Sequence, residues 1–266
     1  MSAPQGPYAF HRPGERVEWL KDHVINGLQA IQTYYLAEGY HHFVVSRLRA
    51  LGIDVRPVEV EGALMLAYAY HDIAKAAEPY QSVIVEGHGA PGHELVSAYV
   101  AHITLEEGVL RLPEPLGWAC VKAIALHMGA MRDRPERTIR TSIRRILRQA
   151  RCNAFTMSES TTSWFNDLLK RCWHIGGLPP PTLPDHEITI SLEALSFFVA
   201  QELSPRLKGS DRYKAEDLAT LLLLHPVVLA DELAVAINIG RKPRRWAKDF
   251  TDSVEEARKY RRGGLR

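Results

Sequence analysis

Apolar side chains recur along most of this sequence with the spacing of an α-helix, and this periodicity restricts what the chain can fold into. The first such segment, residues 19–37, places on one helical face Leu20, Val24, Leu28, Ile31 and Tyr35. We find no convincing run of alternating apolar and polar residues bounded by hairpin turns. The pattern therefore predicts an all-α chain.

The same spacing predicts the remaining helices. We expect a short helix at about 41–51, a long, apolar and central helix at 58–77, a helix from about 94 to 104 after a glycine-rich loop, and another from Pro115 to about Gly129. An arginine-rich helix is expected at 135–151 and a further helix at 192–203, followed by a polar connector at 204–211. Pro226 is expected in the first turn of the next helix.

Composition is that of an ordinary globular protein. Of the 266 residues, 46% are hydrophobic and 24% are charged, which favours one packed core over a disordered chain. We expect one helical domain at 1–240 and a basic C-terminal tail at 241–266 that belongs to the same unit. The longest apolar run, 218–230, is short and interrupted, and the N-terminus has no signal-peptide pattern, so we expect no membrane partner and a cytoplasmic location.

Basic residues are concentrated in two segments, although the net charge is only +2. One contains arginines at 132, 134, 137, 140, 144, 145, 148 and 151, and the other spans residues 241–262. Apolar residues at helical spacing should turn the arginines of the first segment outward. Contact of Arg140, Arg144 and Arg148 with DNA phosphates and simple solvation of these side chains both remain open.

The segment LAYAYHDIAKA places an ionisable pair, His71 and Asp72, among apolar residues. On a helix these neighbours lie about 100° apart, so that one imidazole and one carboxylate can hold a metal ion between them. Burial of such a pair is costly unless a cation or partner compensates it. Lys75 would lie on the same helical face, where it could offset a phosphate charge, although a Lys–Asp surface pair explains this spacing equally well.

Other candidate ligands lie before and after the His71-Asp72 pair. His23 precedes it on a helix, and it is followed by His93-Glu94 with Ser97, by His127, and by Asp231 in an ADELA segment. In this order they resemble the HD superfamily of metal-dependent phosphohydrolases. Within that superfamily, GHELVSA at 92–98 and ALHMG at 125–129 are most similar to the stand-alone HD nuclease subunit of type I CRISPR interference.

The resemblance implies a compact helical HD-domain fold and a metal site. It places His23, His71, Asp72 and Asp231 around one divalent ion, and His93 and His127 at a second ion bridged through Asp72, with Lys75 and Asp72 as catalytic residues. These ligand types favour one or two ions of Mn, Ni, Co or Fe, with Mg possible.

Met128 departs from the family pattern, which usually has two adjacent histidines at this position. A thioether is a poor ligand for hard divalent ions. The second ion is therefore expected to be weakly held, absent, or completed by His88 or His102.

The resemblance predicts a metal-dependent nuclease, acting as an endonuclease or exonuclease, that hydrolyses phosphodiester bonds of single-stranded DNA together with an RNA-guided CRISPR effector complex. The sequence contains no GxxxxGK[ST] motif, so we expect the helicase to be a separate subunit. Two alternatives remain: an HD-type nucleotide phosphohydrolase, and a non-catalytic nucleic-acid-binding subunit.

Overall fold

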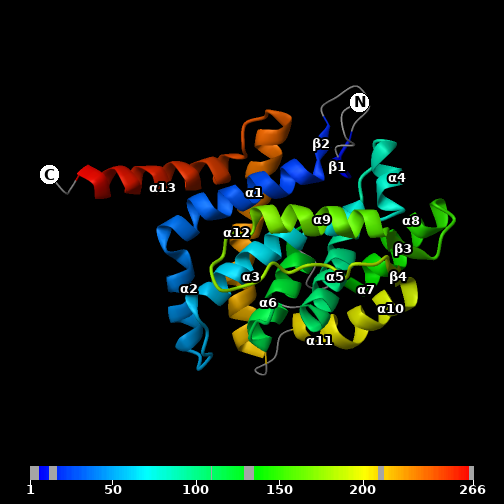
Figure 1. Cartoon of the computed structure of the whole chain (residues 1–266), viewed down its shortest axis with the longest axis horizontal. Coiled ribbons are helices and arrows are strands. Elements are labelled where there is room, and N and C mark those ends of the chain that lie inside the picture. The colour runs from blue at the N-terminus through cyan, green and yellow to red at the C-terminus, as the bar shows by residue number, and fades with distance from the viewer. Residues whose placement is uncertain (1–5, 12–16, 109, 129–134, 209–212, 264–266) are drawn as a thin grey trace.

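The computed structural model describes residues 6–11, 17–108, 110–128, 135–208 and 213–263, and these residues are mainly helical (Figure 1). The predicted fold class is therefore confirmed. The α-helices are α1 (Leu20–Tyr34), α2 (Tyr40–Arg49), α3 (Pro57–Tyr70), α4 (Tyr80–Val85), α5 (His93–Glu107), α6 (Glu114–Leu126), α7 (Pro135–Thr138), α8 (Arg144–Gln149), α9 (Glu159–Cys172), α10 (Leu192–Phe197), α11 (Ser204–Leu207), α12 (Lys214–Ile239) and α13 (Arg245–Gly263). Single 3-10 turns form η1 (Leu36–Glu38) and η2 (Ile73–Ala76), and π-helical turns form η3 (Ile139–Ile143) and η4 (Phe198–Leu203).

Helix α3 lies at the centre of the core. Its residues from Ala63 to Tyr70 are all fully buried, and it packs against α1, α2, α5, α6 and α12. A helix that is apolar around its whole circumference is stable only inside a protein. The predicted central position of this helix is confirmed.

The predicted end of the central helix is wrong. The α-helix stops at Tyr70, and Asp72 has φ −114° and ψ 4°, so His71 and Asp72 lie at a break and not within a continuous helix. The chain then tightens into η2, where the backbone N–H of Ala74 donates to the Oγ of Ser97 at 3.1 Å. Ser97, on α5, thus satisfies a backbone group at the break.

The predicted helix start at Pro226 is also wrong, because α12 runs through this proline. A proline inside a helix leaves the carbonyl four residues earlier without its N–H donor. Here the hydroxyl of Tyr40 donates to that carbonyl, of Leu222, at 3.0 Å. Within the described part of the chain, α12 is the helix long and apolar enough to cross a membrane, but 56% of its apolar window is buried inside the protein.

Two small antiparallel sheets were not predicted. The strands are β1 (Tyr8–Phe10) with β2 (Glu18–Trp19), and β3 (Ala154–Met157) with β4 (Ile188–Ser191). Their alternation extends over four residues at most, which is too short to distinguish from other patterns. Strand β2 matters for the site because it positions Glu18 immediately before α1.

The arginine-rich segment is helical from 135 to 149, with the π-helical turn η3 between α7 and α8. Its isoleucines and Leu147 are buried and Arg140, Arg144 and Arg148 are exposed, as expected, whereas Arg132 and Arg134 lie outside the described residues. The expected connector at 204–211 begins with α11 instead.

Most of the basic tail forms α13, which projects from the rest of the protein in Figure 1. Arg258 on this helix donates to Glu38 at 2.5 Å and ties α13 to the turn after α1.

Candidate metal centre

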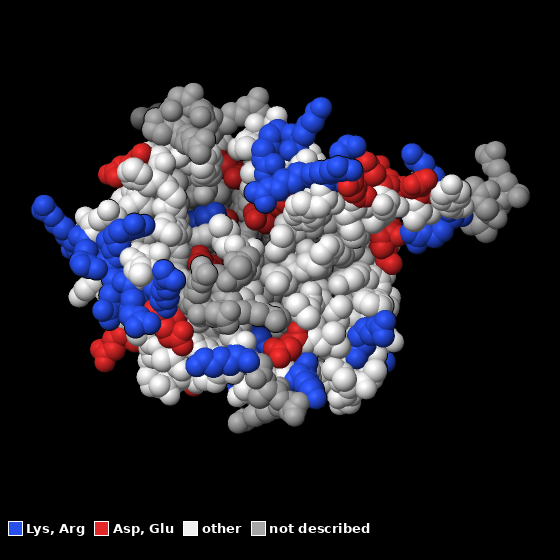
Figure 2. All heavy atoms as spheres, turned by 180° about the vertical axis from the view of Figure 1, so that it is seen from behind, with Lys and Arg blue, Asp and Glu red and all other residues white. Residues whose placement is uncertain are grey.

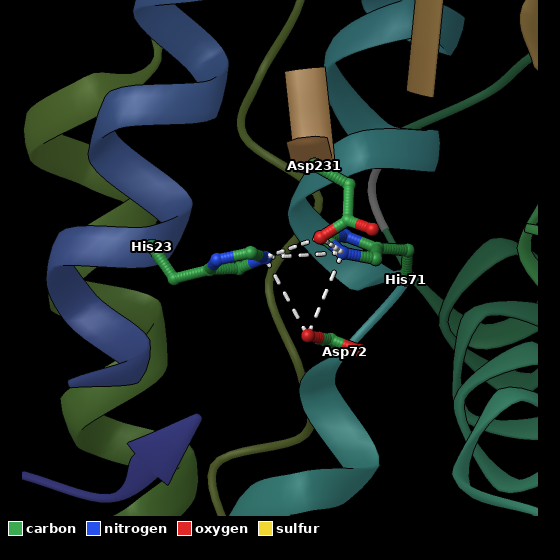
Figure 3. A group of neighbouring side chains, drawn as sticks. All are labelled: His23, His71, Asp72 and Asp231. Atoms are coloured by element: carbon green, nitrogen blue, oxygen red, sulfur yellow. Dashed lines mark hydrogen bonds and ion pairs between the residues drawn. The ribbon is translucent and has the colours of Figure 1, made fainter. Parts of the chain in front are cut away.

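Four side chains from three distant segments converge in one cluster (Figure 3). His23 comes from α1, His71 and Asp72 from the break after α3, and Asp231 from α12. The Nε2 atom of His23 lies 3.2 Å from Nε2 of His71, 3.5 Å from Oδ2 of Asp72 and 3.3 Å from Oδ1 of Asp231. The predicted first set of ligands is thus brought together.

A second cluster shares Asp72 with the first. His93, the first residue of α5, places its Nε2 atom 2.8 Å from Oδ1 of Asp72, and His127, at the end of α6, places its Nε2 atom 3.7 Å from the same oxygen. Asp72 therefore directs Oδ2 toward the first cluster and Oδ1 toward the second. This is the arrangement of a carboxylate that can bridge two ions.

All four histidines present the same ring nitrogen to the clusters. The other nitrogen, Nδ1, contacts an acceptor in each case: Glu18 Oε1 at 2.8 Å from His23, Tyr68 O at 2.5 Å from His71, Ala90 O at 2.6 Å from His93, and Ile124 O at 2.6 Å from His127. A carbonyl oxygen can only accept, so Nδ1 must carry the proton. The unprotonated Nε2 is then free to donate its lone pair to a metal.

Three atoms of the second cluster are buried without a hydrogen-bond partner: Asp72 Oδ1, His93 Nε2 and His127 Nε2. Because Nδ1 carries the proton of each neutral ring, Nε2 can only accept a hydrogen bond. His93 Nε2 and Asp72 Oδ1 are then both acceptors, although they lie only 2.8 Å apart. Such an arrangement is unfavourable unless a positive charge lies between the acceptors. The residues present therefore fit a divalent cation.

Glu18 was missed by the sequence analysis. Its buried carboxylate accepts from Nδ1 of His23 and from Asn238 at 2.8 Å each. Burial alone would lower the pKa of His23, but its hydrogen bonds to Asp231 and Glu18 raise it to about 10. Without a metal, Nε2 of His23 therefore carries a proton, and a divalent ion would take the place of this proton. No motif marks Glu18, because it lies on a two-residue strand and meets His23 only after β2 turns into α1.

Lys75 contacts the shared carboxylate. Its Nζ atom lies 2.6 Å from Oδ2 of Asp72, and its side chain remains 19% exposed. Burial would raise the pKa of Asp72, but the charge of Lys75 holds it well below its usual value, so this carboxylate stays ionised. The pair is buried on the aspartate side and is not a surface ion pair.

The two other histidines considered for the second ion lie elsewhere. His88 is exposed, with Nε2 3.9 Å from Glu86 Oε2, and His102 packs against the rings of Trp118 and Phe198. Neither belongs to a metal-binding cluster of the described residues. Met128 is 58% exposed, so within the described chain the second cluster consists of Asp72, His93 and His127.

A comparison with solved structures supports this fold. No family model matches the chain, and no curated protein matches it. Among solved structures, the CRISPR-associated Cas3 HD domain protein of Methanocaldococcus jannaschii superposes with a TM-score of 0.54 and 24% sequence identity, over 79% of this chain and 95% of that one. The chain has the fold of an HD-domain protein and resembles this Cas3 HD domain protein.

Proposed function

We propose that this protein is a divalent-metal-dependent phosphodiester hydrolase that cuts single-stranded DNA in CRISPR interference. The observation that carries the proposal is the pair of His/Asp clusters joined through Asp72. Similarity to a CRISPR-associated HD domain protein supports the cellular context. A separate helicase subunit and an RNA-guided effector complex would supply the unwound strand.

Each of the two clusters would hold one ion. His23, His71, Asp72 and Asp231 would hold one, and Asp72, His93 and His127 the other. Two ions bound there would activate a water molecule and neutralise the phosphate oxygens during phosphodiester hydrolysis. Imidazole and carboxylate ligands favour Mn, Fe, Ni or Co over Mg.

We propose that Lys75 contacts the substrate. Its ammonium lies against Asp72 and lines a cleft beside the clusters. The carboxylate raises the pKa of Lys75 despite burial, so the ammonium stays charged. From this position it would hydrogen-bond a non-bridging phosphate oxygen and stabilise the charge that develops there.

A nucleic-acid polymer fits the surface charge. On the face in Figure 2, Lys and Arg side chains gather in separate groups. Arg140, Arg144 and Arg148 are exposed on the arginine-rich helix, and we propose that they contact DNA phosphates. Arg241 and Arg244 both pair with Glu232, the neighbour of Asp231.

A nucleotide phosphohydrolase is the second candidate, because the cleft, at about 850 Å³, is of a size that also suits a small ligand. The third is a subunit that binds nucleic acid without cutting it.

The test is incubation with Mn, Ni, Co, Fe or Mg and with single-stranded DNA, duplex DNA, RNA or free nucleotides. Wild type is compared with Asp72→Ala and with Asp22→Ala, which removes an exposed carboxylate from α1. Cleavage of single-stranded DNA that is lost only in Asp72→Ala supports the proposal. Cleavage that persists without Asp72 overturns it, hydrolysis of nucleotides alone supports the second candidate, and DNA binding without any hydrolysis supports the third.

A further inference from the structure

The cleft beside the second cluster is built from several segments. Lys75 and His93 belong to its lining, so it opens directly on the metal centre. The remaining walls come from β1, α4, the loop at 88–92 and the arginine-rich helix. Its volume of about 850 Å³ lies within the range of about 300–1,000 Å³ usual for ligand sites.

Much of the wall is apolar. The side chains that give it this character are Phe10, Val83, Ile84, Met128 and Ile146. Every nucleobase has a flat face that packs on apolar and aromatic side chains, whatever its sequence. In a duplex these faces are stacked on one another, so only an unpaired nucleotide can present its base to such a wall.

The arginine-rich helix turns one face toward the cleft. This face contains Thr138, Ser142, Arg145 and Gln149, whereas Arg140, Arg144 and Arg148 do not line the cleft. The π-helical turn η3 contains Ser142 and separates Thr138 from Arg145, and π-helical turns are frequent at functional sites. Arg145 is thus the arginine of this helix that lines the cleft beside the metal centre.

Close packing holds the arginine-rich helix against the loop at 88–92. Gly92, immediately before His93, has φ +87°, and a Cβ atom there would lie 2.7 Å from Cγ1 of Ile143. Only glycine combines this backbone conformation with so close an approach. This contact therefore holds the helix that carries Arg145 close to His93.

The charge of Arg145 is available to a ligand. Its side chain is exposed, and no carboxylate in the described part of the chain lies within ion-pair distance of it. Glu94 also lines the cleft, but it is buried, with Oε2 3.4 Å from Nδ1 of His93. A guanidinium binds phosphate through two parallel hydrogen bonds, which makes an unpaired arginine beside an apolar wall suited to a nucleotide.

We propose that the cleft holds the nucleotide next to the scissile phosphate of an unpaired strand, with its base against the apolar wall and its second phosphate at Arg145. This inference rests on the proposed phosphodiesterase function and specifies its substrate as a strand with at least two phosphates. Arg145 then selects strands over free mononucleotides.

The test measures binding and turnover separately. Fluorescence anisotropy of a labelled oligothymidylate in EDTA, where no hydrolysis occurs, reports the affinity of wild type, Arg145→Ala, Arg145→Lys and Arg171→Ala, the last an exposed arginine on α9. Loss of one phosphate contact should weaken binding by roughly 10-fold and lower the salt slope by about 0.7. Arg145→Lys should fall between wild type and Arg145→Ala, because it keeps the charge without the paired geometry.

Turnover provides the second readout. With metal, the loss of kcat/KM in Arg145→Ala should be about tenfold larger for the oligonucleotide than for bis(p-nitrophenyl) phosphate, which has one phosphate. Equal losses for the two substrates, or an Arg145→Ala salt slope equal to that of wild type, would overturn the inference. Competition by thymidine monophosphate at the same concentration as the oligonucleotide would overturn it as well. Failure of all metals to support hydrolysis would remove the proposed function, whereas the anisotropy experiment would still decide whether Arg145 binds the strand.

Discussion

His23 differs from the other histidines of the metal centre in the acceptor of its Nδ1 proton. His71, His93 and His127 donate to neutral backbone carbonyls, whereas His23 donates to the ionised carboxylate of Glu18. A carboxylate behind an imidazole fixes the ring and makes its other nitrogen a stronger metal ligand. Glu18 therefore strengthens the first site without contacting the ion.

We predict that Glu18→Gln weakens metal binding at the first site by roughly 10–100-fold. The amide oxygen of glutamine can still accept from His23, but it lacks the charge. Isothermal titration with Mn measures the effect, and Asp22→Asn, which removes an exposed charge from the same helix, is the control. Equal affinity in Glu18→Gln and wild type would show that Glu18 only supports the fold.

Lys75 contacts Oδ2 of Asp72, the oxygen that would also bind the first ion. We predict that Lys75→Ala lowers kcat by roughly 100-fold, because the charge that stabilises the substrate phosphate is lost. Metal affinity should be kept or increased, since the ammonium no longer competes for the carboxylate. Steady-state kinetics and metal titration separate these effects, with Lys21→Ala on the exposed face of α1 as control. Loss of bound metal would make Lys75 a structural residue.

At the level of elements, α12 combines two features that normally conflict. It contains Pro226 near its middle, yet it continues without interruption to Asp231 and brings that ligand to α1. The helix tolerates the proline because the hydroxyl of Tyr40, on α2, replaces the missing backbone donor to Leu222. A side chain from another helix thus completes the backbone of α12.

We predict that Tyr40→Phe lowers the free energy of unfolding by about 1 kcal/mol, the usual contribution of one such hydrogen bond. In a Pro226→Ala background the loss should be smaller, because the restored N–H of residue 226 can bond to Leu222. Urea unfolding of wild type, Tyr40→Phe, Pro226→Ala and the double variant measures the coupling between the two substitutions. Additive effects of the two substitutions would contradict a role of Tyr40 in compensating the proline.

At the scale of the whole molecule, the candidate metal centre joins segments that are far apart along the chain. Its ligands come from α1, the break after α3, α5, α6 and α12, which are also the helices that form the core. An ion that binds only the native arrangement of these segments stabilises the fold by mass action. Metal binding and global stability should therefore be linked.

We predict that Mn at about 100 times its dissociation constant stabilises the protein by roughly 2.7 kcal/mol and raises Tm by about 5–10 °C. Asp72→Ala, which removes the ligand common to both clusters, should abolish most of this shift. Differential scanning calorimetry with and without Mn measures it, and Asp22→Ala serves as the control. An equal shift in Asp72→Ala would place the stabilising ion elsewhere.

Local sequence determined the helical class, the apolar central helix and the order of the ligands His23, His71, Asp72, His93, His127 and Asp231. Each depends on the spacing of neighbouring residues or on a short motif, so it can be recognised before the chain folds. The same reasoning placed His93 at the start of a helix and His127 at the end of one, and both positions are confirmed.

Tertiary structure decided the rest, because the deciding partners lie far apart along the chain. The break after Tyr70 depends on Ser97, the continuity of α12 on Tyr40, and the charge behind His23 on Glu18 at the end of a short strand. Which arginine faces the cleft depends on a π-helical turn and on the packing of Ile143 against Gly92. Helical periodicity predicts which face is buried, but only the packed neighbours determine which polar group each side chain meets.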